Sequence, residues 1–285
     1  MADLMSDPLV STAWLADRLE DPSIRILDAS WFMPGTPRDP NAEYALAHIP
    51  GAMRFDIDAV SDHANPLPHM LPEPTDFATA VRRLGVNPDS VVVVYDSIGI
   101  FSAPRVWWAL RAMGHEAVYV LDGGLPRWVE EGHPVETGWR EAEHGEFKAH
   151  PVAELVRDLA EMVETVKTGS STIIDARPAP RFRGAAPEPR PGVRAGHMPG
   201  ALNVPYASLI VDGGLARLAA LRTTFEDAGV DLAAPIVATC GSGISAAVIA
   251  LAFARLGRRD IAVYDGSWTE WGGRADTPVV VDPAP

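Results

Sequence analysis

Short apolar runs alternate with stretches of helical periodicity along the whole chain. The runs are rich in β-branched residues and lie at residues 24–27, 91–95 and 118–121. Apolar residues recur at helical spacing in residues 11–19, 77–84 and 103–113. Strands that alternate with helices favour an α/β fold in which the sheet is largely parallel.

Four sequence markers occur twice in the same order. An apolar-Asp-Ala triplet at residues 27–29 returns at 174–176, His-x-Pro-Gly-Ala at 48–52 returns at 197–201, an Asp-Gly pair at 122–123 returns at 265–266, and Trp128 returns as Trp271. A repeat of this length indicates a duplicated domain. The sequence therefore predicts two tandem domains, residues 8–135 and 152–280, each a mostly parallel sheet flanked by helices, and the 285-residue length suits two domains.

The two halves differ most where one apolar strand ends. Residues 91–95 run into Asp96, whereas residues 236–239 run into Cys240, the single cysteine of the chain. Cys240 precedes a Gly-Ser-Gly turn and a helical stretch at residues 246–256, and the predicted site therefore lies where open α/β sheets place theirs. Glycines in the turn let backbone N–H groups and the helix N-terminus face one point, which favours a thiolate nucleophile over a buried small hydrophobe.

The loop and its upstream motifs resemble a known family. Cys240-Gly241-Ser242-Gly243-Ile244-Ser245, together with residues 175–177 and 196–201, is similar to the active domain of rhodanese-type sulfurtransferases. Residues 102–108 and 121–126 resemble the inactive first domain of the two-domain members, so the resemblance extends over nearly the whole chain. It implies two rhodanese-like domains and a persulfide on Cys240. Asp96 cannot carry sulfane sulfur, and the first domain should therefore lack the chemistry.

The residues after the cysteine bear on the sulfur donor. In this family, thiosulfate enzymes tend to carry basic residues there, whereas those that use 3-mercaptopyruvate carry Cys-Gly-Ser-Gly-Val-Thr. The present loop has no basic residue and departs conservatively at Ile244 and Ser245. The resemblance implies 3-mercaptopyruvate as donor, with Gly241, Gly243, Ile244 and Ser245 at the substrate; thiosulfate as donor is the alternative.

An arginine-rich segment is the second candidate site. Residues 181–184 (Arg-Phe-Arg-Gly) precede Pro187-Glu188-Pro189-Arg190, and the glycine and proline content predicts an ordered loop. The resemblance implies that Arg181 and Arg190 bind the carboxylate and keto oxygen of the donor, with Arg183 as a third member. Planar guanidinium groups hold carboxylates in a defined orientation. A solvated arginine-rich surface is the alternative.

Two residues of the first half complete the expected catalytic set. By resemblance, Asp58 and His69 would form a Ser-His-Asp relay with Ser242, built from both domains. The alternatives are an aspartate that caps a turn and a solvated histidine. Residues with counterparts in both halves are interpreted as scaffold: Asp175, His197, Asp265 and Trp271.

Composition limits the partners. A net charge of −14 argues against nucleic acid, and no apolar run approaches the roughly 18 residues of a membrane span. Residues 1–7 lack the features of a secretory signal, which predicts a cytoplasmic protein. No His-Glu-x-x-His motif occurs, and we expect neither metal nor cofactor. The expected partners are a small-molecule sulfur donor and a thiol acceptor such as thioredoxin, or cyanide.

Two other function classes remain as alternatives. A cysteine-dependent phosphatase has a phosphate loop that is one residue longer and closes with arginine, and the loop from Cys240 to Ser245 contains none. A non-enzymatic sulfur carrier would load sulfur without multiple turnover. The sequence leaves open the physiological acceptor, the oligomeric state and the pathway.

Overall fold

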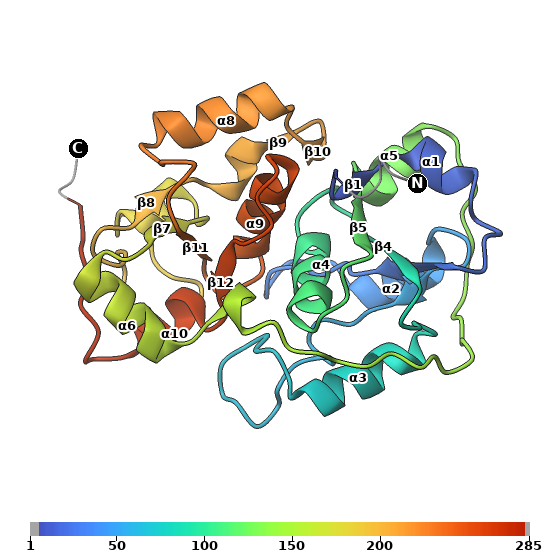
Figure 1. Cartoon of the computed structure of the whole chain (residues 1–285), viewed down its shortest axis with the longest axis horizontal. Coiled ribbons are helices and arrows are strands. Elements are labelled where there is room, and N and C mark those ends of the chain that lie inside the picture. The colour runs from blue at the N-terminus through green and yellow to red at the C-terminus, as the bar shows by residue number, and fades with distance from the viewer. Residues whose placement is uncertain (1–5, 283–285) are drawn as a thin grey trace. The chain divides into compact units, whose positions relative to one another are not determined.

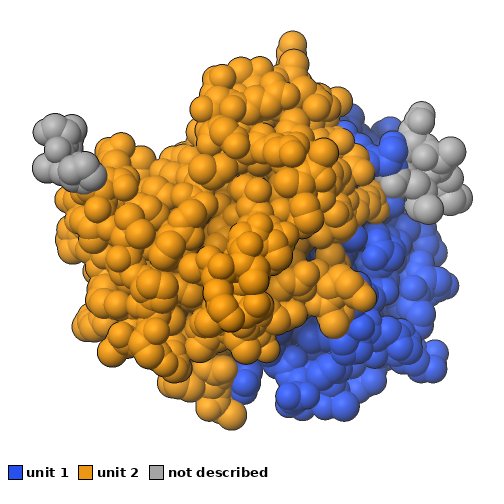
Figure 2. Space-filling view, turned by 60° about the vertical axis from the view of Figure 1, so that its left-hand side comes forward, with its two compact units in different colours: residues 1–63, 71–152, 212–215 blue, residues 64–70, 153–211, 216–285 orange. Residues whose placement is uncertain are grey.

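Each half of the chain builds one five-stranded sheet in the computed structural model, which describes residues 6–282 (Figure 1). Unit 1 comprises the residues up to 63 with 71–152 and 212–215, and unit 2 comprises residues 64–70, 153–211 and those from 216 on (Figure 2).

The two sheets have the same strand order. The first runs β1-β5-β4-β2-β3 and the second β6-β12-β11-β7-β8. The strands of the first are β1 Leu9–Val10, β2 Ile24–Asp28, β3 Met53–Arg54, β4 Val91–Tyr95 and β5 Val118–Leu121. Those of the second are β6 Val156–Arg157, β7 Thr172–Asp175, β8 Leu202–Asn203, β11 Ile236–Thr239 and β12 Ala262–Tyr264. All strand pairings in both sheets are parallel, which confirms the predicted fold class.

Helices flank each sheet. In Figure 1, α4 lies on one face of the first sheet and α2 on the other, and α9 and α6 lie on opposite faces of the second. The helices of the first half are α1 Thr12–Ala16, α2 Pro40–Leu46, α3 Pro74–Arg83, α4 Ala103–Ala112 and α5 Gly124–Glu130. Those of the second are α6 Leu159–Thr168, α7 Ala179–Phe182, α8 Leu218–Asp227, α9 Ala246–Arg255 and α10 Ser267–Gly273. Smaller elements are the 3-10 turns Ala153–Leu155 and Tyr206–Leu209 and the two-stranded sheet of β9 Ile210–Val211 and β10 Gly214–Leu215.

Two helices differ from their sequence-based predictions. Ser11 caps α1 by accepting a hydrogen bond from the backbone N–H of Trp14, but the helix ends at Ala16 and not at residue 19. The stretch expected to be amphipathic at residues 103–113 forms α4, which is buried on all sides. Its two arginines, Arg105 and Arg111, are buried, and each guanidinium lies over a tryptophan ring, a contact that favours a buried cation. Nε of Arg111 also lies 3.5 Å from Oε2 of Glu116.

The repeated histidines hold equivalent places in the two units. Nδ1 of His48 contacts the carbonyl oxygen of Tyr44 at 2.8 Å, and the two rings are stacked. Nδ1 of His197 contacts the carbonyl oxygen of Phe182 at 2.9 Å, again with stacked rings. The backbone of each histidine also pairs with a later segment of its own unit, at residue 136 or 280. These repeated residues therefore serve as scaffold.

None of the helices within residues 6–282 has the length and apolar character required to cross a membrane.

Candidate functional site around Cys240

Cys240 lies at the carboxyl end of β11, a strand with neighbours on both sides, directly before the loop that leads into α9. Its side chain is buried, with 2% of the residue exposed. The Cys240 carbonyl oxygen accepts a hydrogen bond from the N–H of Trp268 at 2.9 Å, and its N–H donates to Oγ of Ser267 at 3.3 Å. The start of α10 therefore fixes the backbone on both sides of the sulfur.

Ser267 is a residue that the sequence analysis did not assign. Its φ is +49°, an uncommon left-handed conformation for a residue with a side chain. Its hydroxyl donates to the carbonyl oxygen of Tyr264 at 2.8 Å and accepts from Cys240. The repeated sequence could have revealed Ser267, because the equivalent residue of the first half is Gly124, which has a φ of +54°. A serine that replaces a glycine at a positive φ indicates that its hydroxyl is used.

Tyr264 also stays protonated beside this loop. Burial raises the pKa of its hydroxyl, and the Glu270 carboxylate raises that pKa further. The hydroxyl donates to Oε2 of Glu270 at 2.8 Å, so both side chains are held in place at the base of α10.

The two glycines of the Cys240 loop, Gly241 and Gly243, differ in backbone conformation. Gly243 has φ of +80°, so it provides the curl that the sequence predicted. Gly241 is not at a positive φ, so its backbone conformation does not by itself require glycine. A Cβ at Gly241 would lie 3.1 Å from Nη2 of Arg181, so a larger residue there would require the guanidinium to shift slightly. The remaining loop residues, Ser242 and Ile244, are buried, and Ser245 is the N-cap of α9.

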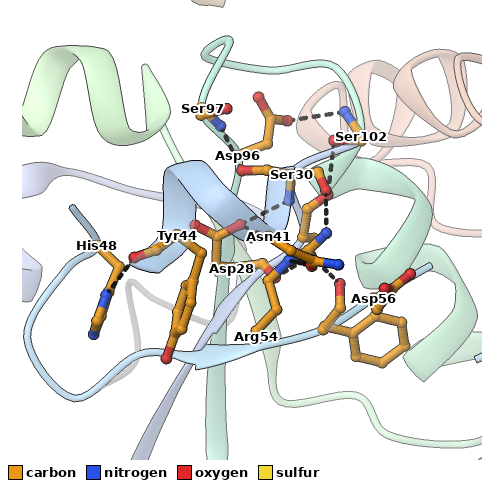
Figure 3. Close-up of polar contacts among 12 residues, drawn as sticks. Asp28, Ser30, Asn41, Tyr44, His48, Arg54, Asp56, Asp96, Ser97 and Ser102 are labelled. Atoms are coloured by element: carbon orange, nitrogen blue, oxygen red, sulfur yellow. Dashed lines mark hydrogen bonds and ion pairs between the residues drawn. The ribbon is translucent and has the colours of Figure 1, made fainter. Parts of the chain in front are cut away.

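Asp96 takes the place of Cys240 in unit 1. Its carbonyl oxygen accepts from the N–H of Leu125 at 3.0 Å, as that of Cys240 accepts from Trp268. Its carboxylate accepts hydrogen bonds of 2.9 to 3.0 Å from five backbone N–H groups within residues 98–103. Figure 3 shows the contact with Ser102, next to Ser97, whose N–H donates to Oγ of Ser30. The loop of unit 1 is therefore an anion cradle filled by its own carboxylate.

Arg181 lies in the one-turn helix α7, not in the loop that the sequence predicted. Prolines at residues 178 and 180 start this helix, because a proline costs nothing in a first turn, whose N–H groups have no helical acceptor. The Arg181 side chain is 19% exposed, and Nη2 is its atom nearest Gly241. The structure thus brings this predicted donor-binding residue beside the Cys240 loop. Arg183 is exposed.

Arg181 is held by an ion-pair network that the sequence did not reveal. Glu188 accepts from Nε and Nη2 of Arg181, and its Oε1 also accepts from Nη1 of Arg177 at 2.9 Å. Arg177 in turn donates to both carboxylate oxygens of Asp175 and to the carbonyl oxygen of Gly196. Asp175 and Arg177 were visible as a motif, but nothing local linked them to Glu188.

His69 and Arg190 contact each other within unit 2. Nη2 of Arg190 lies 3.4 Å from Nε2 of His69, a buried residue with φ of +63°. Because a guanidinium only donates, this contact requires the tautomer of His69 that carries its proton on Nδ1. Because His69 is buried, the alternative in which it is a solvated histidine is wrong.

Asp58 belongs to unit 1, where its Oδ2 accepts a hydrogen bond from the indole N–H of Trp31 at 3.1 Å. The turn is capped by Asp56, whose carboxylate accepts from the N–H groups of Asp58 and Ala59. Within residues 6–282, no group of three or more His, Cys, Asp or Glu side chains is arranged to hold a metal ion.

Comparison with known proteins gives consistent matches. A family model described as "Rhodanese-like domain" matches residues 11–131 and again residues 155–274. The 3-mercaptopyruvate sulfurtransferase of Escherichia coli (strain K12) is 48% identical over 271 residues, which are 95% of this chain and 96% of that protein. The thiosulfate sulfurtransferase of Rattus norvegicus is 42% identical over 275 residues, or 94% of this chain and 92% of that one. The crystal structure of SseA from Escherichia coli superposes with a TM-score of 0.85 at 44% identity, covering 92% of this chain and 99% of that chain.

Proposed function

The chain belongs to the family of proteins with rhodanese-like domains, and from this premise we propose that it is an enzyme that transfers sulfur from 3-mercaptopyruvate, through a persulfide on Cys240, to an acceptor thiol. In this proposal residues 152–280 are the catalytic domain, and residues 8–135 form a second rhodanese-like domain that carries no sulfur.

The reaction proceeds in two halves. The Cys240 thiolate attacks the sulfur of 3-mercaptopyruvate, a bond forms between the two sulfurs, and the carbon–sulfur bond breaks. The electron pair of that bond leaves with the enolate of pyruvate, which takes up a proton to give pyruvate. An acceptor thiolate then attacks the outer sulfur, so that the acceptor leaves as a persulfide and the Cys240 thiolate returns. These steps balance without a cofactor.

Two arginines suit the binding of the donor. The guanidinium of Arg181 lies over Gly241, one residue from the nucleophile, where it would hold the donor carboxylate. Arg190 would bind the keto oxygen, and its contact with Nε2 of His69 leaves the ring proton on Nδ1. We propose that Ser242, His69 and Asp58 deliver the proton that the enolate requires. Gly243, Ile244 and Ser245 complete the loop at the substrate.

The observation that carries the choice of donor is the charge around Cys240. The loop up to Ser245 has no basic residue, and the charge of Arg181 is offset by the Glu188 carboxylate. This environment suits a donor with one carboxylate better than the dianion thiosulfate. Thiosulfate remains the second candidate because one relative of similar identity is named a thiosulfate sulfurtransferase.

The acceptor and the compartment follow from the chemistry. A persulfide needs a thiol to take its outer sulfur, and we propose a dithiol such as thioredoxin, with cyanide as a laboratory acceptor. We place the enzyme in the cytoplasm, because reducing compartments keep both the acceptor and Cys240 as thiols.

The deciding experiment measures pyruvate release from 3-mercaptopyruvate and thiosulfate turnover by the same preparation. Mass spectrometry of the donor-treated protein should show one added sulfur on the peptide that contains Cys240. We expect a higher kcat/KM with 3-mercaptopyruvate. A higher value with thiosulfate would reverse the donor assignment, and sulfur loading without repeated turnover would favour a sulfur-carrier module.

A further inference from the structure

Glu188 is a buried carboxylate between two guanidinium groups. Its side chain is 4% exposed, whereas its neighbours in the sequence, Pro187 and Pro189, are exposed. Oε1 accepts from Nη1 of Arg177 at 2.9 Å and from Nε of Arg181 at 3.3 Å, and Oε2 accepts from Nη2 of Arg181. A buried carboxylate needs such partners, because burial without them is costly.

One of the two arginines is a fixed anchor. Arg177 is 1% exposed, its guanidinium lies 4.3 Å from the ring centroid of Trp268, and it donates to Asp175 and to the carbonyl oxygen of Gly196. The contacts of Arg177 with Asp175, Gly196 and Trp268 do not involve Glu188, so Arg177 would keep them if Glu188 were replaced. The position of Glu188 is set by this anchor, so Glu188 can in turn set the position of Arg181.

The contact with Glu188 determines which edge of Arg181 remains available. A guanidinium presents one pair of donors along its Nε and Nη2 edge and another between Nη1 and Nη2. Glu188 takes the first edge, and Nη2 is also the atom nearest Gly241, with Cζ and Nη1 slightly farther from the same point. The edge that ends in Nη1 is thus left for an anion beside the Cys240 loop.

We infer that Glu188 is a positioning residue for sulfur transfer: it holds Arg181, through the anchor Arg177, in the orientation that binds the donor carboxylate. The inference rests on the proposed function, because it assigns the donor carboxylate to Arg181. It makes Glu188 a determinant of donor binding that does not itself touch the donor. The competing explanation is that Glu188 only stabilises the fold around Arg177.

A double-mutant cycle separates these explanations. The variants are Glu188→Gln, Arg181→Ala and the combination, measured for pyruvate release from 3-mercaptopyruvate with excess small dithiol. Glutamine keeps the size of the side chain, and Arg177 keeps Asp175, so the fold should persist. We expect Glu188→Gln to raise KM roughly 10-fold with kcat within about threefold of wild type, because a lost charge-assisted contact weakens binding.

The combination decides the inference. If Glu188 acts through Arg181, adding Glu188→Gln to Arg181→Ala should change kcat/KM by less than about twofold. A further loss equal to that of the single variant, or an unchanged KM for Glu188→Gln alone, would overturn the inference. Should Glu188→Gln fail to fold by its melting curve, Glu188→Asp, which keeps the charge but is one methylene shorter, is taken through the same cycle with the same criteria.

Two controls complete the design. Glu164 is an exposed glutamate of α6 that pairs with Lys167, and Glu164→Gln should leave KM and kcat unchanged. Absence of pyruvate release by the wild-type chain would overturn the proposed function and the inference with it. Normal wild-type turnover with additive effects in the cycle would overturn the role of Glu188 alone.

Discussion

The loops after β4 and β11 occupy equivalent places in the two units and differ in the residue that begins them, Asp96 in one and Cys240 in the other. Both follow an interior strand of a parallel sheet and lead into a buried helix, and both present a carbonyl oxygen to the start of the next helix, at Leu125 or Trp268. The loop of unit 1 has seven residues, 96–102, and that of unit 2 has six, 240–245.

The difference lies in the side chain that begins each loop. In unit 1 the Asp96 carboxylate accepts hydrogen bonds from five backbone N–H groups. In unit 2 the corresponding side chain is the thiol of Cys240, which we propose alternates between thiolate and persulfide. A fixed carboxylate stabilises the loop but leaves no place for a reacting anion. The comparison teaches that loops in equivalent places of the two units can differ in use: that of unit 1 is held by its own carboxylate, and that of unit 2, in our proposal, carries the sulfur.

The residue at the start of the helix beside each loop also differs, since unit 1 has Gly124 where unit 2 has Ser267. A Cβ at Gly124 would collide with the backbone oxygens of Asp96 and Gly99, so unit 1 admits only glycine there. Unit 2 has Ser267 at the same place, and its hydroxyl holds the N–H of Cys240. Ser267 keeps an uncommon backbone conformation, which costs about 1 kcal/mol or more.

The largest expected effect tests the cysteine itself. Cys240→Ser should abolish turnover with every donor, a loss of about 10⁴-fold or more, because a serine hydroxyl neither ionises near neutral pH nor forms a persulfide. Steady-state assays with both donors measure the loss, and circular dichroism should show an unchanged fold. Residual turnover well above the uncatalysed rate would remove Cys240 from the mechanism.

An added cysteine sharpens that comparison. With Cys240 replaced by serine, Asp96→Cys should restore no turnover, because Ile98 stands in the unit 1 loop where unit 2 has Ser242, the residue that we assign to proton delivery. An arginine alone does not distinguish the two loops, since Nη2 of Arg38 donates to Oγ of Ser97, next to Asp96, at 3.4 Å. Mass spectrometry after treatment with donor, together with the pyruvate assay, checks this outcome. Restored turnover would mean that Ser242 is not required for sulfur transfer.

The arginines are expected to have the next largest effect. Arg181→Ala and Arg190→Ala should each lower kcat/KM for 3-mercaptopyruvate by about 10²-fold, because each loses a charge-assisted contact of roughly 2 to 3 kcal/mol. Arg222, an exposed arginine of α8, provides the matched control, and Arg222→Ala should keep wild-type efficiency. Wild-type kinetics in both test variants would exclude the carboxylate clamp.

Asp96→Asn tests how much the hydrogen bonds of the Asp96 carboxylate contribute to the free energy of unfolding. An amide offers one acceptor oxygen and turns donors toward backbone N–H groups, so we expect a loss of about 2 kcal/mol in the free energy of unfolding, measured in urea. Exposed Asp89, in the same unit, is the control, since Asp89→Asn should change stability little. Sulfur loading of Cys240 should stay normal. An Asp96→Asn variant as stable as wild type would contradict the role of the carboxylate as a stabilising anion.

The smallest effect is expected when unit 2 is made to resemble unit 1. Ser267→Gly relieves the backbone strain and removes the acceptor for the Cys240 N–H, two changes of about 1 kcal/mol each that oppose one another in stability. The melting temperature should change little, while kcat with 3-mercaptopyruvate should fall roughly 3- to 10-fold. An unchanged kcat would show that Ser267 has only a structural role.

Local patterns in the sequence determined much of this protein. Apolar periodicity and the repeated markers specified two parallel α/β domains, because strand and helix patterns are set by residues close in the chain. The same patterns located Cys240 at the end of an interior strand and Asp96 in the equivalent place. The family resemblance then directed attention to Arg181, which the structure does place beside Gly241.

The tertiary structure decided what depends on residues distant in the chain. The close neighbour of Gly241 is Arg181, sixty positions earlier, and the support of Cys240 comes from Ser267, twenty-seven positions later. The burial of Arg105 and Arg111 in α4 depends on the tryptophan rings beneath their guanidinium groups and, for Arg111, also on Glu116, whose Oε2 lies 3.5 Å from its Nε. In the sequence, Glu188 is a charged residue between two prolines and has no visible partner. In the fold it accepts hydrogen bonds from both Arg177 and Arg181 and so connects these two arginines. A sequence pattern records which residue follows which, whereas these contacts depend on how the folded chain brings separate segments together.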